Sequence, residues 1–366
     1  MAKIYSYVLV TGATGLVGAH VVAILLQRGF KVRAVVRSKA KAQKMMELHD
    51  ACLDKLDFHY IDDLTSPNAF EGALTDIDGV IHLASVGTTC IKPQLHETWL
   101  TSVLNQPLNY QVSDNEKELI IPAIQGVRSI LEASKKTSVR RIVMTSSFGA
   151  VLDMARDMET PYTFSSSDWN PITYSEAADP SATPQDAYRG SKVFAEQEAW
   201  RFVETETPNF DLVTLCPSMI FGPVAGILES PNDLNESNKM LYKVATGGPS
   251  SPLPPARFNF WIDVRDLAEI HFQALLNPKA GGKRYIPVSP EKFNYQLISD
   301  VIAKDVPGWS KDNISTGVQD IKHHISVDTR QTEEDFPGIE YRTLKQTVVD
   351  FMGQISAISV PYSSIR

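Results

Sequence analysis

The chain has 366 residues, of which 43% are hydrophobic and 21% charged, a composition typical of a globular protein in water. Its net charge of -8 leaves no basic excess for binding nucleic acid or an anionic membrane, and no apolar stretch is long enough to span a bilayer. The three cysteines are widely spaced without a CxxC pair, which argues against a disulfide framework or a zinc site. We therefore expect a cytoplasmic protein with reduced thiols and no metal.

The first predicted unit is a buried strand, a glycine-rich turn and a helix. The apolar run 8–10 leads into Thr11-Gly12-Ala13-Thr14-Gly15-Leu16-Val17-Gly18, and an apolar helical run, 20–28, follows. Gly12 permits the tight turn, Gly15 lets the backbone approach a pyrophosphate, and Gly18 lets the helix pack on the strand. The helix N-terminus offers free N–H groups to phosphates. We predict a dinucleotide site, with contacts from Thr11, Gly12, Thr14, Gly15, Leu16, Val17 and Gly18.

The end of the second predicted strand, 31–37, indicates which dinucleotide binds. NAD sites commonly place Asp or Glu there, where the carboxylate accepts a hydrogen bond from the ribose 2′-hydroxyl. Here Arg37 takes that position, and Lys41 follows four residues later. A guanidinium suits a 2′-phosphate, which a carboxylate would repel, although a solvated basic helix start would look the same. We predict NADPH or NADP+ as the cofactor.

The third predicted strand, 57–61, ends in acidic residues at the edge of the sheet where ligands bind. Asp63 either accepts from the adenine amino group or caps a helix that begins near Pro67, and both interpretations stay open. Leu64 lies at the same edge, and both residues are predicted to contact the cofactor. A helix over 39–50 is expected before this strand.

The fourth predicted strand, 80–85, brings Ala84 to the cofactor and carries His82 inside an apolar run. We expect His82 to be a hydrogen-bonded core residue. Residues 86–115 are irregular, and a loop of this length after a strand end is usually functional, so we expect it to overhang the nicotinamide. The apolar periodicity of 116–136 then predicts one long helix.

The candidate chemistry begins with a fifth buried strand, 141–147, that ends in hydroxyl side chains. Tyr188 and Lys192 follow on a predicted helix, where residues four apart lie one turn apart on the same face. A neighbouring ammonium favours the phenolate, which lets a tyrosine exchange a proton near neutral pH. Tyr188 is a candidate general acid toward an alkoxide, Lys192 a candidate partner of the nicotinamide ribose, and Ser147 a candidate donor to a carbonyl oxygen.

Five stretches of the chain resemble the extended short-chain dehydrogenase/reductases. They are Thr11 to Gly18, Ile81 to Ser85, Thr145 to Ser147, Tyr188 to Lys192 and Trp261 to Ala268. Within that family the chain is similar to the dihydroflavonol reductase and cinnamoyl-CoA reductase group, and most of all to fungal NADPH-dependent aldehyde and methylglyoxal reductases. Ser147 to Ala155, Asp168 to Pro171, and Arg37 with Lys41 carry this closer likeness.

The resemblance implies an α/β fold, a Rossmann-type doubly wound parallel sheet with a smaller C-terminal substrate lobe. Residues 1–216 would form the NADP-binding domain, with 264–280 returning to it, and 217–366 would be mainly the substrate lobe. The chain departs from the family pattern at Gln125, where many extended members place asparagine, and in a longer segment at 91–115.

The resemblance also implies a catalytic triad of Ser147, Tyr188 and Lys192. Ser147 is preferred to Ser146 because the family's serine is the second of such a pair. Pro217 and Ser218, which turn out of a sixth strand, would lie beside the nicotinamide.

The predicted function is therefore NADPH-dependent reduction of a small carbonyl compound, apolar or aromatic, by a monomer or homodimer. An NAD(P)-dependent hydroxysteroid dehydrogenase or a sugar-nucleotide epimerase on the same scaffold is the alternative, and Arg37 disfavours the tightly held NAD of an epimerase. A non-catalytic NADP-sensing regulator is a third possibility, but it would not need Ser147, Tyr188 and Lys192 together.

Overall fold

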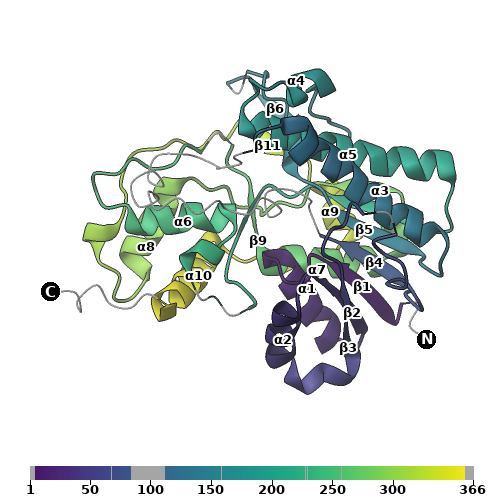
Figure 1. The fold of residues 1–366 in the computed structure, drawn as a ribbon. Helices are drawn as coiled ribbons and strands as arrows, with labels where there is room; N and C mark the ends of the chain where they lie inside the picture. The colour runs from purple at the N-terminus through teal and green to yellow at the C-terminus, as the bar shows by residue number, and fades with distance from the viewer. Residues whose placement is uncertain are drawn as a thin grey trace.

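The computed structural model describes residues 5–66, 68–83, 112–157, 159–226, 228, 230–256 and 258–358. Within them a parallel sheet of seven strands forms the larger part, and a helical lobe lies beside it (Figure 1). The strand order is β10-β7-β5-β4-β1-β2-β3. The strands are β1 (Tyr7–Thr11), β2 (Lys31–Val36), β3 (Leu56–Tyr60), β4 (Gly79–His82), β5 (Arg141–Thr145), β7 (Asp211–Leu215) and β10 (Lys283–Tyr285).

The order of the strands places a topological switch point between β1 and β4. From β1 the chain adds β2 and β3 on one side, and it then adds β4, β5, β7 and β10 on the other. In doubly wound sheets, ligands bind in the crevice outside the carboxyl ends of the strands at such a point. The fold therefore directs attention to the residues that follow β1 and β4.

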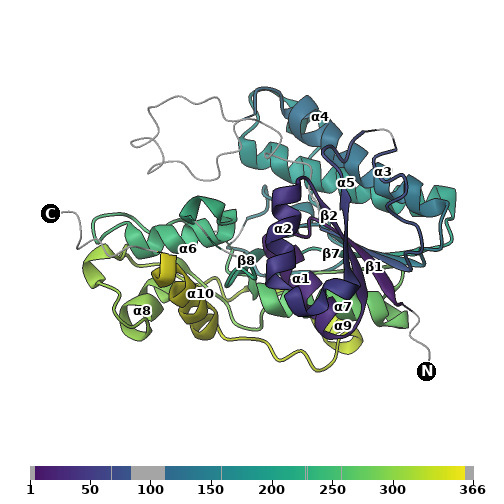
Figure 2. The same ribbon diagram turned by 60° about the horizontal axis from the view of Figure 1, so that its bottom comes forward.

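Helices cover both faces of the sheet because its central strands are apolar on both sides. On one face lie α1 (Leu16–Gln27), α2 (Lys39–Leu48) and α7 (Val264–Leu276), whose apolar residues share one core cluster with β1 and β2. On the other face lie α3 (Ile121–Lys135) and α5 (Pro184–Glu206), which share a second cluster with β4 and β5. The two views of the ribbon show the sheet between these layers (Figures 1 and 2).

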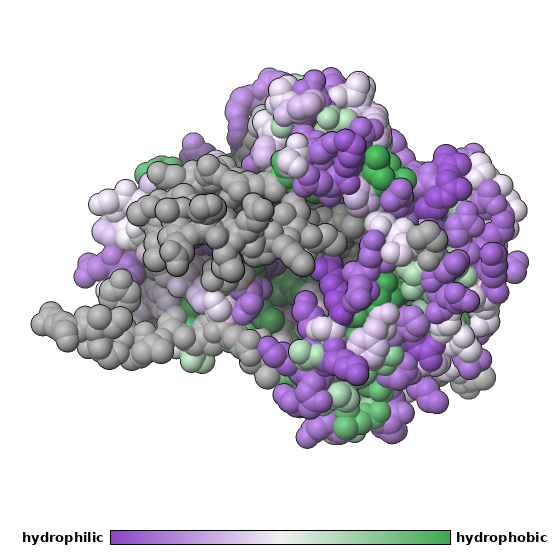
Figure 3. Space-filling view, in the orientation of Figure 1, coloured by the Kyte–Doolittle hydropathy of each residue, from purple (hydrophilic) through white to green (hydrophobic). Residues whose placement is uncertain are grey.

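The lobe has a core of its own, formed by α6 (Glu236–Thr246), α8 (Tyr295–Asp305) and α10 (Leu344–Ile358). Figure 2 shows these helices grouped away from the sheet. Two short parallel pairs lie outside the main sheet, β8 (Met219–Phe221) with β9 (Trp261–Asp263) and β6 (Tyr162–Phe164) with β11 (Ile325–Val327). In the space-filling view, apolar side chains show in the hollow between the two parts (Figure 3).

The remaining elements are short. They are the α-helices α4 (Tyr174–Ala178) and α9 (Arg330–Asp335), the π-helix η2 (Glu116–Ile120), and the 3-10 helices η1 (Asp50–Lys55), η3 (Phe148–Ala150), η4 (Pro231–Asp233), η5 (Pro278–Ala280) and η6 (Lys311–Asn313).

The predicted α/β class and doubly wound parallel sheet are confirmed, and two predicted helices need correction. The helix expected near Pro67 does not form over the described residues of 64–76, which make turns. Asn68 and Asp76 have φ of 61° and 62° there, a left-handed conformation that an α-helix does not contain. The long helix expected over 116–136 begins as the π-helix η2, since the Ile121 N–H bonds the Glu116 carbonyl and Pro122 has no N–H.

The glycine turn is closed by an unusually near approach between α1 and the end of β1. Gly12 has φ of 65°, and its carbonyl oxygen accepts from the Gly15 N–H at 2.9 Å. A Cβ atom added at Gly18 would lie 2.1 Å from the Gly12 carbonyl oxygen and 2.8 Å from its carbon. Backbone atoms cannot move aside as a flexible side chain can, so only glycine fits at this position.

Substitution of Gly18 by alanine is therefore expected to destabilise the protein. Overpacking of this kind costs about 1–3 kcal/mol, and backbone neighbours place it toward the upper end. The matched control is Gly353→Ala in α10, where an added Cβ meets nothing within 4 Å. That variant should gain about 0.5–1 kcal/mol, because alanine is the better helix former. Urea unfolding measures both, and equal stabilities for the two variants would contradict the packing described.

Candidate active site

The strand ends at the switch point are joined by a buried hydrogen bond. The Thr11 hydroxyl, at the end of β1, lies 2.9 Å from Nδ1 of His82, at the end of β4. Both side chains are buried, which confirms the prediction of a hydrogen-bonded core histidine. Burial, together with the smaller effect of the positive charge of Lys192, lowers the pKa of His82 to about 4. Lys192 on α5 thus lies close enough to the end of β4 for its charge to lower the pKa of His82.

The N-terminus of α1 has the properties of an anion site. Gly15 is its N-cap, no described side chain caps it by a hydrogen bond, and no acidic residue stands in its first turn. Thr14 and Gly15 are exposed, while Leu16 and Val17 are half-buried. The unused N–H groups and the dipole of α1 therefore fit the pyrophosphate of a dinucleotide. A side chain at Gly18 would clash with the Gly12 carbonyl, so it would push the start of α1 away from the end of β1.

Arg37 and Lys41 flank the start of α2 directly beyond the end of β2. The Ser38 hydroxyl caps this helix by accepting from the Lys41 N–H at 3.3 Å, which fixes both residues at the carboxyl edge of the sheet. Both side chains are exposed, and neither forms an ion pair with another described residue. Two cations beside the ribose end of the crevice fit a 2′-phosphate.

Asp63 caps a tight turn after β3. Its carboxylate accepts from the Thr65 N–H at 2.8 Å, the Thr65 hydroxyl at 2.7 Å and the Ser66 hydroxyl at 3.2 Å. The bonds from Thr65 lower the pKa of this carboxyl. Leu64 is buried beside it. The interpretation of Asp63 as a helix cap is wrong, because no helix forms over the described residues of 64–76 and the carboxylate bonds a turn instead. The adenine contact stays a prediction.

Three further residues are predicted to contact the cofactor, and the structure describes Pro217 and Ser218 but not Ala84. Ala84 lies outside the described residues, as does most of the irregular segment 86–115. Pro217 and Ser218 follow β7, where the Pro217 carbonyl accepts from the Phe148 N–H at 2.8 Å and the Ser218 hydroxyl donates to the Phe260 carbonyl at 2.9 Å. The turn that carries Pro217 therefore adjoins η3, which begins immediately after Ser147.

Tyr188 and Lys192 lie on one face of α5, as their spacing predicted. Thr183 caps this helix by accepting from the Asp186 N–H, and Pro184 occupies its first turn. The Lys192 Nζ atom is 5.4 Å from the centroid of the Tyr188 ring. Both residues are half-buried, so part of each remains accessible while neighbouring elements surround the rest.

Ser147 stands at the N-cap of η3, against the part of α5 that carries Tyr188. Its hydroxyl oxygen accepts from the Gly149 N–H at 3.0 Å, which leaves the hydroxyl proton to be donated. A Cβ atom added at Gly149 would lie 3.2 Å from this oxygen and 3.4 Å from the Arg189 side chain. Gly149 thus lets η3 approach α5 at Arg189, the residue after Tyr188, so the three predicted catalytic residues lie on adjoining elements.

The hydroxyl of the neighbouring Ser146 is already engaged in a hydrogen bond. It donates to Oε2 of Glu196 at 2.6 Å, and both residues are buried. The Cys216 thiol also contacts this carboxylate; burial and then the charge of Glu196 raise the pKa of the thiol well above its usual range. Cys216 therefore stays protonated and is no nucleophile.

Sequence reasoning missed the roles of Glu196 and Arg284, which form a buried ion pair with Nε and Oε1 2.8 Å apart. One signal was available for Glu196, which stands four residues beyond Lys192 and eight beyond Tyr188 on the same helix face. Arg284 lies in a three-residue strand between charged and polar neighbours, and nothing local marks it.

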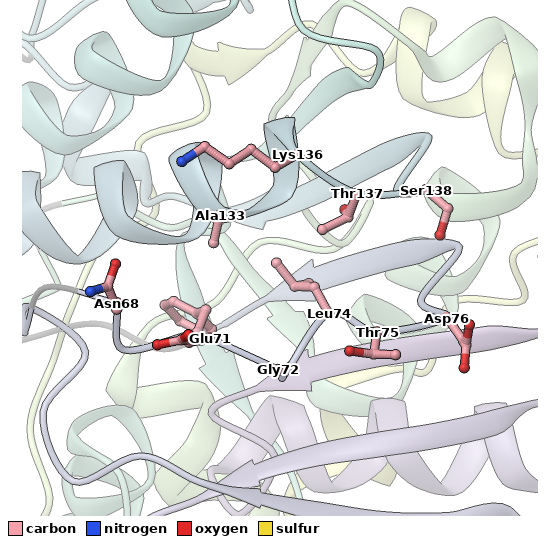
Figure 4. Close-up of a pocket in the computed structure, with 11 residues that line it drawn as sticks. Asn68, Glu71, Gly72, Leu74, Thr75, Asp76, Ala133, Lys136, Thr137 and Ser138 are labelled. Atoms are coloured by element: carbon pink, nitrogen blue, oxygen red, sulfur yellow. The ribbon is translucent and has the colours of Figure 1, made fainter.

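A pocket of about 520 Å³ lies away from this site, between the segment 68–76 and the end of α3 (Figure 4). Two of its hydroxyls are already used, since Thr137 donates to the Ser134 carbonyl and Ser138 to the Ile77 carbonyl. The chemistry gathers instead at the carboxyl ends of the strands. In the described part of the chain, no group of three or more metal-ligating side chains comes together, and no helix is long and apolar enough to cross a membrane.

Comparison with known proteins agrees with this geometry. Residues 12–179 match a family described as NAD(P)H-binding, and residues 109–294 match the NAD dependent epimerase/dehydratase family. The chain is 32% identical to the NADPH-dependent methylglyoxal reductase Gre2 of Saccharomyces cerevisiae, over 95% of this chain and 97% of that protein. It is 30% identical to an Aspergillus niger ketoreductase, over 84% of each. The crystal structure of Candida albicans Gre2 with NADPH superposes with a TM-score of 0.83 at 29% identity, covering 97% of this chain and all of that one.

Two buried histidines are expected to make stability depend on pH. Burial lowers the pKa of His271, like that of His82, to about 4; its Nδ1 donates to the Leu267 carbonyl, and its Nε2 lies 2.6 Å from the Thr145 hydroxyl. The unfolded chain binds these protons near pH 6.5. Each neutral histidine therefore contributes stability above pH 6.5 that is lost as the pH falls toward 4, by roughly 3 kcal/mol each.

Urea unfolding at pH 7.0, 5.5 and 4.5 measures this loss, and His271→Gln should make it smaller. Substitution of the exposed His323 by Gln provides the control and should leave the pH dependence as in the wild type. The same pH dependence in His271→Gln as in the wild type would contradict the assignment.

Proposed function

Because the chain belongs to the NAD dependent epimerase/dehydratase family, we propose that it is an NADPH-dependent reductase of aldehydes and ketones. The resemblance to the extended short-chain dehydrogenase/reductases is confirmed by the relatives, among them reductases named for NADPH and a ketoreductase. The observation that carries the proposal is the pairing of Tyr188 and Lys192 on α5, against the turn of Ser147.

The proposed reaction uses three side chains of this chain. Ser147 donates its hydroxyl proton in a hydrogen bond to the carbonyl oxygen of the substrate and so orients it. Bound NADPH supplies the hydride that reduces the carbonyl carbon. Tyr188 gives its phenolic proton to the oxygen as negative charge develops there, and the Lys192 ammonium stabilises the phenolate that remains.

The cofactor would be held along the carboxyl edge of the sheet. The N–H groups at the start of α1 suit the pyrophosphate, and Arg37 with Lys41 suits the 2′-phosphate. The full proposed set is Thr11, Gly12, Thr14, Gly15, Leu16, Val17, Gly18, Arg37, Lys41, Asp63, Leu64, Ala84, Tyr188, Lys192, Pro217 and Ser218. Residues 1–216 with 264–280 would form the cofactor domain and 217–366 mainly the substrate lobe; the packing of α7 against α1 supports the return of 264–280.

We propose an apolar or aromatic carbonyl compound as the substrate. Phe148 directly follows Ser147, and its ring centroid lies 5.7 Å from that of the partly buried Phe258 and 5.6 Å from that of Phe260. Phe148 and Phe260 are buried, so the partly buried Phe258 is the ring of this cluster that supports an apolar surface near Ser147. We further propose a cytoplasmic monomer or homodimer that binds neither nucleic acid nor membranes, in keeping with its net charge of -8.

Substitution of Tyr188 by phenylalanine is expected to abolish carbonyl reduction while NADPH still binds. Loss of a general acid costs about 10²–10⁴ in turnover, because the alkoxide has no proton donor. NADPH oxidation with a panel of aldehydes, followed optically, measures the loss, and fluorescence titration measures binding. Tyr174→Phe is the control, since the hydroxyl of this exposed side chain donates to Glu116 at 2.9 Å on the surface. Turnover near that of the wild type in Tyr188→Phe would remove Tyr188 from this role.

Substitution of Arg37 by aspartate is expected to lower the preference for NADPH over NADH. A hydrogen bond to a charged group contributes about 1.5–3 kcal/mol, so the ratio of kcat/KM values should fall at least about tenfold. Lys31→Asp, the same change of charge at the opposite end of β2, is the matched control and should keep the ratio. An unchanged ratio in Arg37→Asp would exclude Arg37 from binding the 2′-phosphate.

A further inference from the structure

A fully buried carboxylate, Glu196 of α5, binds three strands of the sheet. It accepts from the Ser146 hydroxyl beyond β5 at 2.6 Å, from the Thr214 hydroxyl of β7 at 2.7 Å, and from Arg284 of β10 at 2.8 Å. The Arg284 guanidinium also approaches the second carboxylate oxygen at 3.2 Å. Every oxygen of this carboxylate is therefore satisfied, and α5 is fixed in register with the strand ends one turn beyond Lys192.

The other side of the Arg284 guanidinium holds backbone carbonyls near Ser147. It donates to the carbonyls of Ala150 at 3.3 Å and Ser166 at 3.1 Å, and to that of Asp168. Its carbon lies 3.9 Å from the centroid of the Trp169 ring. Ala150 ends η3, the short helix that Ser147 caps, so Arg284 connects the catalytic helix to the turn of the catalytic serine.

Asn170, the residue after Trp169, also holds the turn that contains η3. The Asn170 side chain donates to the Gly149 carbonyl at 2.9 Å, and the Asn170 N–H donates to the Ala150 carbonyl at 2.9 Å. The Ala150 carbonyl thus accepts from Asn170 as well as from Arg284. Arg284 also contacts the segment that carries Asn170, through the Ser166 and Asp168 carbonyls and the Trp169 ring.

A buried ion pair is weak evidence for a role in stability, because desolvation of the two charges offsets most of their attraction. The effect of this ion pair on the position of Ser147 is the stronger argument here. A serine side chain has one rotatable bond to its oxygen, so the place of the Ser147 hydroxyl follows the backbone of the turn. A misplacement of about 1 Å at a reacting group costs roughly 100-fold in rate.

We propose that Arg284 is a positioning residue of the reductase, which acts through Ser147 by fixing η3 against the helix that carries Tyr188 and Lys192. The inference rests on the proposed function. Arg284 touches neither substrate nor cofactor in this account. Glu196 serves as its anchor, and Ser147 is the group whose hydrogen bond to the carbonyl oxygen depends on it.

A double-mutant cycle tests this dependence. Arg284→Lys keeps the charge beside Glu196, but the three N–H donors of one ammonium cannot replace the guanidinium bonds to both Glu196 oxygens and to three carbonyls. The kcat/KM for an aldehyde should therefore fall about 10- to 100-fold. In a Ser147→Ala background the same change should cost less than about twofold, because the hydroxyl that Arg284 positions is gone. The NADPH dissociation constant should stay unchanged in all four proteins. Equal losses in the two backgrounds, or no loss in Arg284→Lys, would overturn the proposal.

Arg141→Lys is the matched control for destabilisation alone. Arg141 is also a buried arginine of the sheet, paired with Asp211 at 2.6 Å and bound to the Ala274 carbonyl at 2.9 Å, but it stands at the opposite end of β5 from Ser147. Its substitution should lower the melting temperature as Arg284→Lys does, with equal effects on kcat/KM in both backgrounds. Coupling of Arg141→Lys to Ser147→Ala as large as that of Arg284→Lys would show that the coupling is not specific.

A fallback variant and the activity of the wild type keep the test of the positioning role separate from misfolding and from failure of the proposed function. If Arg284→Lys does not fold, the double variant Glu196→Gln/Arg284→Gln removes both charges, leaves no unpaired buried ion, and enters the same cycle. Failure of the proposed function is a separate result: the wild type would then oxidise NADPH with no aldehyde of the panel. Activity in the wild type without coupling between positions 284 and 147 overturns the positioning role alone.

Discussion

The buried carboxylate of Glu196 is the interaction on which the arrangement of the candidate site depends. This one side chain of α5 accepts hydrogen bonds from the Ser146 hydroxyl beyond β5, the Thr214 hydroxyl of β7 and the Arg284 guanidinium of β10. Removal of any one partner would leave a buried charge or polar group short of a bond, which is costly in a low-dielectric interior. The proposed proton donor and the proposed oxygen-binding serine, on elements far apart in sequence, are in this way held to each other.

A second constraint, the close approach of Gly18 to Gly12, serves the cofactor. It brings the unused N–H groups of α1 to the switch point, where the strand order reverses between β1 and β4. The hydrogen bond between Thr11 and His82 ties these two strand ends together, and the charge of Lys192 acts on His82 from α5. The sites proposed for the phosphates and for the chemistry therefore share one edge of one sheet, as hydride transfer requires.

Much of this could be predicted from the sequence because the signals were local. The central strands contain short apolar runs such as 8–10 and 142–144, the glycine spacing marks the turn, and Tyr188 and Lys192 stand four apart on a helix. The features that could not be predicted depend on contacts between residues far apart in the sequence or on the local backbone conformation. β10 is three residues long and contains Lys283 and Arg284, Glu196 meets Arg284 across 88 positions, and the turns after Asp63 rest on left-handed residues. Ser146 and Ser147 could be told apart by motif alone; the structure adds that the Ser146 hydroxyl already donates to Glu196.

We infer that this edge directs a hydride from NADPH to a carbonyl carbon. Incubation of the protein with [4-²H]NADPH and an apolar aldehyde, followed by mass spectrometry of the alcohol, tests this transfer. We expect one deuterium on the carbinol carbon when the label occupies the transferred face of the nicotinamide, and none when it occupies the other face. Alcohol that is unlabelled with both forms of the cofactor, or NADPH oxidation without alcohol, would contradict it.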